Sequence, residues 1–178
     1  MKLLKLVPDS VLWFYALDDV IHDNILAEAK RRGIGAERIV FAGFAKQEEH
    51  LARLPLADIF LDTFNVNAHT TASDALWAGV PVVTKVGKQF AARFAASLLH
   101  TVDLDELTAA TPQQYQAIAL KLARDPEYLA DVKARLQDSI KSGPLYDTES
   151  FTRNFEALME KAVERFDAGL KPAHISLK

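Results

Sequence analysis

Residues 61–81 read LDTFNVNAHTTASDALWAGVP, and the order of residue types along this stretch decides the fold. The apolar end of a strand is followed by a polar loop, and a helix then begins near Thr70 or Thr71. Gly79 is expected to end that helix, because glycine readily adopts the left-handed conformation that closes many helices. A β-branched run, residues 82–84, comes directly after it. Strand, helix and strand in this order predict a parallel βαβ unit.

The same alternation continues on both sides of this unit. We expect strands at residues 11–15, 39–42, 59–61, 82–84 and 101–102, and helices at residues 25–32, 48–54, 71–78 and 90–99. The strands are apolar along their length, which is typical of strands covered on both faces. The sequence therefore predicts an α/β, Rossmann-like domain with a mainly parallel sheet over residues 1–110.

From residue 111 onward the pattern becomes purely helical. Apolar residues recur every three or four positions over residues 115–122, 129–140 and 151–166. Pro112 and Pro126 precede the first two of these runs, and proline is favoured in the first turn of a helix. We expect a C-terminal helical segment, residues 111–168, packed on the sheet domain, followed by a flexible tail at residues 169–178.

Composition and charge exclude several classes of function. The 178 residues are 49% hydrophobic and 25% charged, which suits a single folded domain. A net charge of −3 argues against general nucleic-acid binding, which needs a positive surface. The chain has no cysteine, so disulfides and thiolate metal sites are excluded. No apolar run is long enough to cross a bilayer, and no signal peptide is evident, so a cytoplasmic protein without membrane contact is expected.

The start of the helix at Thr70 and Thr71 is the strongest candidate for chemistry. The first turn of a helix has unpaired N–H groups and the positive end of the helix dipole, and two hydroxyls add further donors. Such a helix start can bind a diphosphate. Asp74 lies about one turn further along and can accept hydrogen bonds from ribose hydroxyls, while His69 can donate to a phosphate or a sugar.

A simpler alternative for the same residues is helix capping. In that case Thr70 or Thr71 caps the helix and Asp74 is the partner in a capping box. This alternative leaves His69 and the two asparagines, Asn65 and Asn67, without a role.

Two more loops lead from a strand into a helix. His50 and Arg53 are three residues apart, so they share one helix face and can stack on or hydrogen-bond a base; the alternative is a solvated helix start. Lys88 can touch a phosphate, or it belongs to a solvated basic turn. The segment Asp103-Leu104-Asp105 matches the Asp-x-Asp pattern of metal-dependent sugar transferases, but a short helix beginning at Asp105 is the better interpretation. We predict no metal site.

Six motifs occur in one order: VLW at 11–13, EEH at 48–50, LDT at 61–63, HTT at 69–71, DALWAGVP at 74–81 and RFAASL at 93–98. Together they resemble the C-terminal catalytic region of the O-linked N-acetylglucosamine transferase family, with its bacterial and SPINDLY-like relatives. The resemblance covers about residues 2–166 and is most specific at 69–81. It implies the GT-B architecture, in which a UDP-sugar binds between two Rossmann-like domains without a metal or another cofactor.

The resemblance also implies roles for individual residues. The diphosphate would be held by Thr70 and Thr71 with His69 beside it, the ribose by Asp74, and the uracil by the Ala45 backbone, Arg53 and His50. The family usually has a ribose-contacting lysine where this chain has Gln47. Lys46 precedes that position by one residue and is its nearest substitute, although the shift points it elsewhere on a helix. No catalytic base is assigned.

The family's first strand of this domain, with a glutamine and a lysine that bind phosphate, has no counterpart here. The N-terminal catalytic domain and the tetratricopeptide repeats have none either. We therefore expect a donor-binding part of a longer enzyme that transfers N-acetylglucosamine to protein Ser or Thr, inactive alone. The strands beside the missing one must close the gap or recruit a strand, and a homo-oligomer is one solution. The alternatives are a UDP-sugar epimerase of the same architecture and a non-catalytic interaction module.

Overall fold

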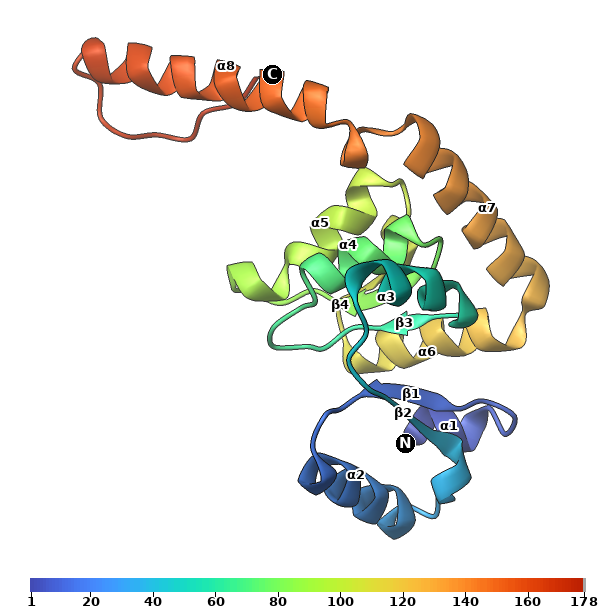
Figure 1. Cartoon of the computed structure of the whole chain (residues 1–178). Coiled ribbons are helices and arrows are strands. Elements are labelled where there is room, and N and C mark those ends of the chain that lie inside the picture. The colour runs from blue at the N-terminus through green and yellow to red at the C-terminus, as the bar shows by residue number, and fades with distance from the viewer. Residues whose placement is uncertain (178) are drawn as a thin grey trace.

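The structure of the chain, a computed structural model, describes residues 1–177 as eight α-helices and five short strands (Figure 1). The strands are β1 (Leu12–Tyr15), β2 (Ile39–Ala42), β3 (Phe60–Leu61), β4 (Val82–Lys85) and β5 (Thr108–Ala109). The helices are α1 (Lys2–Leu6), α2 (Asp19–Arg31), α3 (Gln47–Arg53), α4 (Thr70–Trp77), α5 (Phe94–Thr101), α6 (Pro112–Arg124), α7 (Pro126–Ser142) and α8 (Thr148–Asp167). Strands alternate with helices as far as α6, so the α/β prediction is confirmed.

All the strand pairs are parallel, but they form two sheets. One sheet contains β1 and β2, and the other has the order β3-β4-β5. Within residues 1–177 no hydrogen-bonded ladder joins β1 to β3, and Figure 1 shows the two sheets apart. Within residues 1–177 the gap is therefore not closed, and recruitment of a strand from another copy of the chain stays a prediction.

Several boundaries differ from the sequence prediction. The last strand is β5 and not residues 101–102, because Thr101 still belongs to α5 and the Val102 side chain turns into the core. The helix expected at residues 90–99 is divided at Arg93 into a 3₁₀ turn, Phe90–Ala92, and α5. The helix expected to begin at residue 25 is α2, which begins at Asp19. The carboxylate of Asp18 caps it by accepting the N–H of Val20 at 2.7 Å. The short helix α1 was not predicted.

The main core surrounds β4. Val82 and Val83 are fully buried, and α4, α5 and α6 all pack against this strand. Leu136 of α7 is also fully buried in the same cluster. Burying an aliphatic side chain contributes roughly 1.5–3 kcal/mol, so this cluster is the main source of stability.

Gly79 closes α4 and sets the direction in which the chain enters β4. Its φ is +78°, in the left-handed region, and its N–H donates to the carbonyl of Leu76 at 2.9 Å. The N–H of Val80 donates to the carbonyl of Ala75, also at 2.9 Å. These two bonds form a Schellman motif, which confirms that this glycine ends the helix.

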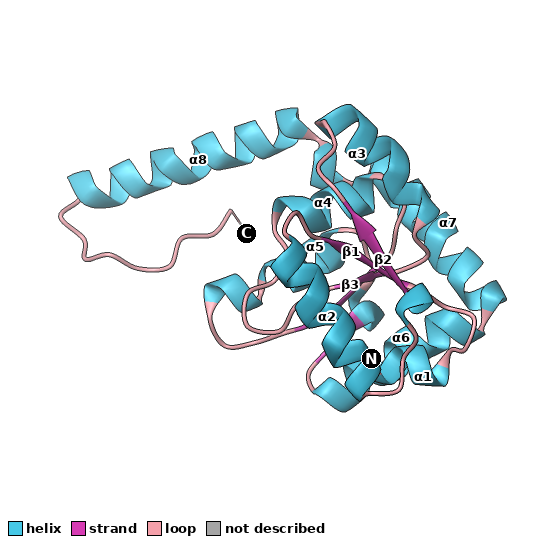
Figure 2. Ribbon diagram, turned by 60° about the horizontal axis from the view of Figure 1, so that its bottom comes forward, coloured by secondary structure: helices cyan, strands magenta, loops and turns pink. Residues whose placement is uncertain are grey.

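The C-terminal helices differ in how they pack. α6 packs on β4 and β5, and α7 packs on α6 and α4. In contrast, α8 extends away from the rest of the molecule and has no buried residue (Figures 1 and 2). The chain then turns back along α8, where the amine of Lys161 donates to the carbonyl of Ser176 at 2.8 Å. The division at residue 110 stays a prediction, and Lys178 of the expected tail lies outside the described residues.

Candidate functional site

The candidate residues lie on three loops that leave the carboxyl ends of parallel strands. The loop after β2 leads into α3, the loop after β3 leads into α4, and the loop after β4 leads into the 3₁₀ turn and α5. Carboxyl ends of parallel strands are where ligands bind in open α/β sheets. The loops and the helices that follow carry every predicted residue: Ala45, Lys46, Gln47, His50 and Arg53 after β2; His69, Thr70, Thr71 and Asp74 after β3; Lys88 after β4.

The N-terminus of α4 is open. The N-cap residue is His69, and no side chain caps the helix. Thr70 and Thr71 are exposed, and no acceptor for their backbone N–H groups is present among residues 1–177. The capping alternative is therefore wrong: neither threonine is the cap, and Asp74 accepts no N–H at the helix start. These donors remain available to an anion.

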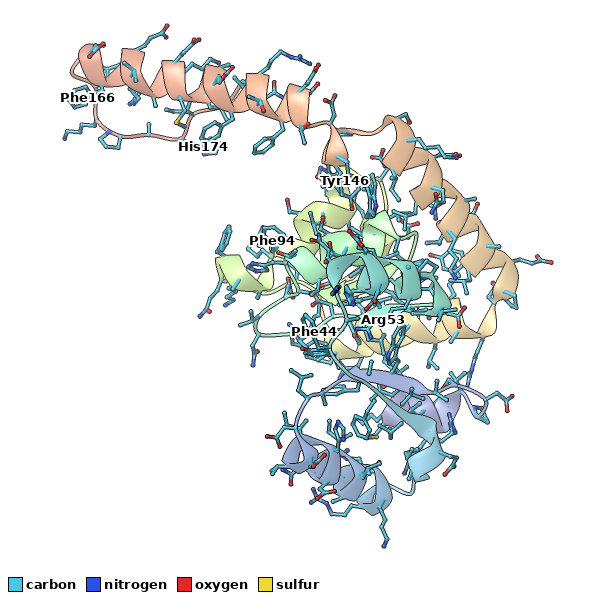
Figure 3. The ribbon with its side chains drawn as sticks, viewed as in Figure 1. Phe44, Arg53, Phe94, Tyr146, Phe166 and His174 are labelled. Carbon is cyan, nitrogen blue, oxygen red and sulfur yellow. The ribbon has the colours of Figure 1, made fainter. Side chains whose placement is uncertain are left out.

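Aromatic packing fixes the ring of His69. It stacks on Phe94 of α5, with centroids 4.3 Å apart, and meets the edge of Phe90 at 6.3 Å. Phe94 is labelled in Figure 3. The Nε2 atom of His69 is buried and has no partner within residues 1–177. The ring is thus held beside the open helix start with one polar atom unsatisfied.

A buried carboxylate organises the loop that leads to α4. Asp62 is only 4% exposed, and its Oδ1 accepts the N–H groups of Thr63 at 2.8 Å and Ala68 at 2.7 Å. Its Oδ2 accepts the hydroxyl of Thr84 on β4 at 2.5 Å. Burial raises the pKa of Asp62, and these three hydrogen bonds oppose that rise. The hydroxyl of Tyr115 on α6 donates to the Asp62 carbonyl at 3.0 Å.

Asp62 is not among the residues that the sequence predicted for the site. A carboxylate at the end of an apolar strand was the available signal, but its partner on β4 is 22 residues away. Nothing in the local pattern indicates that pairing.

The loop after β4 lies beside the loop after β3. The N–H of Asn67 donates to the carbonyl of Ala91 at 2.7 Å, and the N–H of Gly87 donates to the carbonyl of Ala92, also at 2.7 Å. Lys88 lies in this closed turn, is exposed, and has no side-chain partner among residues 1–177. The turn that carries Lys88 is thereby brought next to the loop that carries His69.

On α3, His50 and Arg53 form a pair. Arg53 Nη2 lies 3.2 Å from His50 Nδ1, so the arginine donates and the imidazole proton is on Nε2. Arg53, labelled in Figure 3, also donates to the Gly43 carbonyl at 3.2 Å. Its guanidinium lies 5.6 Å from the centroid of the Trp13 ring. Leu54, which follows α3, is buried in the same core cluster as α4. Both candidate helices are thus anchored to one core.

The remaining candidates are less constrained. Lys46 and Gln47 are exposed, and their side chains have no partner among residues 1–177. Asp74 is half-buried near Tyr146, whose hydroxyl donates to the carbonyl of Ser73 at 2.7 Å (Figure 3). Burial raises the pKa of Tyr146, and the charge of Asp74 raises it further. Within residues 1–177 no hydrogen bond or ion pair joins Asp74 to His50 or Arg53.

Residues 1–177 contain neither a cluster of metal-ligating side chains nor a helix that could span a membrane. No three His, Asp or Glu side chains there lie close enough together to hold a metal ion. Asp105 begins a 3₁₀ turn and lies 3.0 Å from His100 Nδ1. No helix in this range has the length and apolar character needed to cross a membrane.

Comparisons with known proteins agree on one family. Glycosyl transferase family 41 matches residues 1–155. The UDP-N-acetylglucosamine–peptide N-acetylglucosaminyltransferase of Caenorhabditis elegans is 36% identical over 176 residues, which cover 99% of this chain and 15% of that protein. The probable UDP-N-acetylglucosamine–peptide N-acetylglucosaminyltransferase SEC of Arabidopsis thaliana is 32% identical, over 99% of this chain and 18% of that protein. The chain therefore spans less than a fifth of the length of these two relatives.

A solved structure supports the same conclusion. A mutant of the Thermobaculum terrenum O-GlcNAc transferase superposes with a TM-score of 0.85 at 33% identity, covering 90% of this chain and 31% of that one. A family match over most of the sequence and a shared fold at this identity lead to one assignment. The chain belongs to glycosyl transferase family 41.

Proposed function

We propose that this chain supplies the donor site for transfer of N-acetylglucosamine from UDP-N-acetylglucosamine to Ser or Thr hydroxyls of a protein acceptor. The observation that carries the proposal is the open N-terminus of α4, where Thr70 and Thr71 leave their N–H groups unpaired beside His69. The names of the similar proteins, which are UDP-N-acetylglucosamine–peptide transferases, support the choice of donor and acceptor.

Glycosyl transfer leaves a diphosphate carrying new negative charge. Donors fixed in place before the reaction stabilise such charge without reorganising. In this proposal the first turn of α4 and the hydroxyls of Thr70 and Thr71 bind the diphosphate, His69 lies beside it, and Lys88 adds a positive charge nearby. The helix dipole acts in the same direction.

The nucleoside is assigned to the remaining candidates. Asp74 accepts hydrogen bonds from the ribose, and the Ala45 backbone, His50 and Arg53 address the uracil. Gln47, with Lys46 before it, takes the place of the family's ribose-contacting lysine. No metal or other cofactor takes part in the proposal, and the catalytic base is left unassigned.

The acceptor and the rest of the enzyme complete the proposal. Transfer requires donor and acceptor to be held in near-attack geometry, which can lower the barrier by several kcal/mol. The side chains gathered at α4 address the donor alone. We propose that a protein acceptor and the N-terminal catalytic domain of the longer relatives supply the other wall of the cleft, and that this chain alone binds donor without transferring sugar. A homo-oligomer that covers the open strand edges stays a prediction.

Calorimetric titration of the purified chain tests the donor site. UDP is expected to bind more tightly than ADP or GDP, with and without EDTA, because the site addresses the base and uses no metal. Replacing Asp74 with Ala should weaken UDP binding by about 1–3 kcal/mol, the scale of a hydrogen bond to a charged group. Asp138→Ala, an exposed carboxylate on α7, is the matched control and should leave binding unchanged.

Three outcomes would contradict the proposal. Equal affinity for the three diphosphates would remove the uracil site, loss of binding in EDTA would remove the metal-free mechanism, and an unchanged Asp74→Ala variant would remove Asp74 from the ribose site. Conversion of UDP-N-acetylglucosamine into an epimer without acceptor would favour the epimerase alternative.

A further inference from the structure

The loop between β3 and α4 is held at both ends by one side chain. Asp62 is the first residue after β3, and its Oδ1 accepts an N–H at the beginning of the loop, from Thr63, and at its end, from Ala68. Ala68 directly precedes His69, the N-cap residue of α4. The carboxylate therefore fixes the position of the backbone at the N-terminus of α4.

The second oxygen connects this loop to the centre of the sheet. Asp62 Oδ2 accepts the hydroxyl of Thr84, which is fully buried on β4. β4 lies between β3 and β5 and is packed by three helices, so it is the most constrained strand of the molecule. The start of α4 is thus positioned relative to β4 and not only by its own loop.

A contribution to stability alone does not account for this arrangement. Burying a carboxylate costs free energy, and replacing buried charges by apolar residues of similar size is often neutral or stabilising. Burial does raise the pKa of Asp62, as expected for a carboxylate held in spite of its desolvation. A negative charge near an anion site also offers no electrostatic benefit, so any contribution to binding must come from geometry.

We propose that Asp62, locked by Thr84, is the positioning residue of the diphosphate subsite and holds His69, Thr70 and Thr71 in their binding arrangement. This inference rests on the proposed donor site. A positioning role differs from a purely structural role in one respect. Loosening the loop between β3 and α4 should weaken binding of the diphosphate and spare binding of the nucleoside, which is assigned to α3 and Asp74.

Two threonine variants on paired positions provide the test. Thr84 and Thr108 face each other as register partners on β4 and β5, and the Thr108 hydroxyl is buried without a hydrogen-bond partner within residues 1–177. Thr84→Val removes the hydroxyl that binds Asp62, whereas Thr108→Val removes one that binds nothing. Calorimetry with UDP and with uridine should show UDP binding about tenfold weaker in Thr84→Val, uridine within about twofold, and neither changed in Thr108→Val.

Asp62→Asn should behave nearly as the wild type toward UDP, because the amide keeps Oδ1 as an acceptor and its NH₂ can donate to the Thr84 hydroxyl. Asp62→Ala, which removes both acceptors, should lose UDP binding selectively. Equal weakening of UDP and uridine in Thr84→Val, together with a lower melting temperature, would show a purely structural role. Unchanged UDP affinity in that variant would also overturn the inference.

A ligand-free measurement separates this inference from the proposed function. If the wild-type chain bound no UDP, the proposed donor site would fail, and amide hydrogen exchange would still decide the role of Asp62 in holding the loop. Exchange over residues 63–73 should accelerate in Thr84→Val, with α6 and α7 unchanged and with no acceleration in Thr108→Val. Unchanged exchange over that segment would overturn the positioning role.

Discussion

The strand β1, with the sequence LWFY, is more apolar than β4, with the sequence VVTK, and yet it is the more exposed of the two. β4 lies between two strands and is packed by three helices, and its two valines are fully buried. Within residues 1–177 β1 pairs with β2 alone, and Phe14 and Tyr15 are 39% and 56% exposed. Apolar sequence makes a segment suitable for a buried parallel strand, but burial itself depends on the neighbours that the rest of the fold supplies.

The two cores show the same contrast. Among the described residues, 1–177, seventeen buried side chains form the cluster around β4, and four form the cluster between α1, α2 and β2. The loops assigned to the diphosphate leave strands of the larger core. The loop assigned to the base leaves β2, which belongs to the smaller one. The anion subsite is therefore expected to be more rigid than the loop that carries Ala45, whereas α3, with His50 and Arg53, is anchored to the large core through Leu54.

Two matched leucine variants should give the largest difference between these regions. Leu136 of α7 is fully buried in the large core, whereas Leu17, after β1, is 64% exposed. Leu136→Ala should lower the free energy of unfolding by about 2–5 kcal/mol, because it leaves a cavity. Leu17→Ala should change it by less than about 0.5 kcal/mol. Urea denaturation measures both, and similar losses in the two variants would contradict the division into a strong and a weak core.

A smaller effect is expected where α6 is joined to the end of β3. Tyr115→Phe removes the hydroxyl that donates to the Asp62 carbonyl, and should cost about 1 kcal/mol of unfolding free energy. Tyr128→Phe on α7 is the control, because its hydroxyl has no hydrogen bond recorded within residues 1–177. If the two variants were equally stable in urea, the bond to Asp62 would contribute nothing to the large core.

The smallest expected effect is a dependence on pH. Burial raises the pKa of Asp62 in the folded chain, so between the ordinary Asp range and that raised value the folded state binds more protons than the unfolded state. The stability contributed by this group is thus fully present below the unfolded pKa and is lost as pH rises through the folded one. Asp62→Asn lacks this titration.

Melting temperatures of both proteins, taken from about pH 4 to about pH 7, measure the effect. The wild type should lose stability relative to Asp62→Asn as pH rises across this range. A constant difference between the two proteins, or one of opposite slope, would show that the hydrogen bonds from Thr63, Ala68 and Thr84 outweigh the desolvation of the carboxylate.

Local sequence predicted most of the fold. The alternation of apolar runs with helical periods gave the order of elements, and Gly79 marked the end of α4 because a left-handed residue was needed there. The errors came from longer-range effects. The last strand is β5 because its position depends on pairing with β4, and the division at Arg93 follows a loop closed by the hydrogen bond between Gly87 and Ala92. Neither contact has a local signature.

The candidate site was predictable to a similar extent. Helix starts after strands pointed to Thr70 and Thr71, since the chemistry of an N-terminus is local. Asp62 carried no such signal, because its function depends on a threonine of another strand. The stacking of His69 on Phe94 likewise joins two helices that the sequence pattern treats separately.

The projecting helix α8 has a consequence for the timescales of motion in the molecule. It is 20 residues long and none of them is buried, so its amides are protected mainly by helix formation. An isolated helix of about 20 residues exchanges between helix and coil within about a microsecond. Its amide protons should therefore exchange with solvent through local fraying, whereas the amide protons of β4 should exchange only through global unfolding. One chain would then contain amides whose lifetimes differ by orders of magnitude, with the slow ones beneath the candidate donor site.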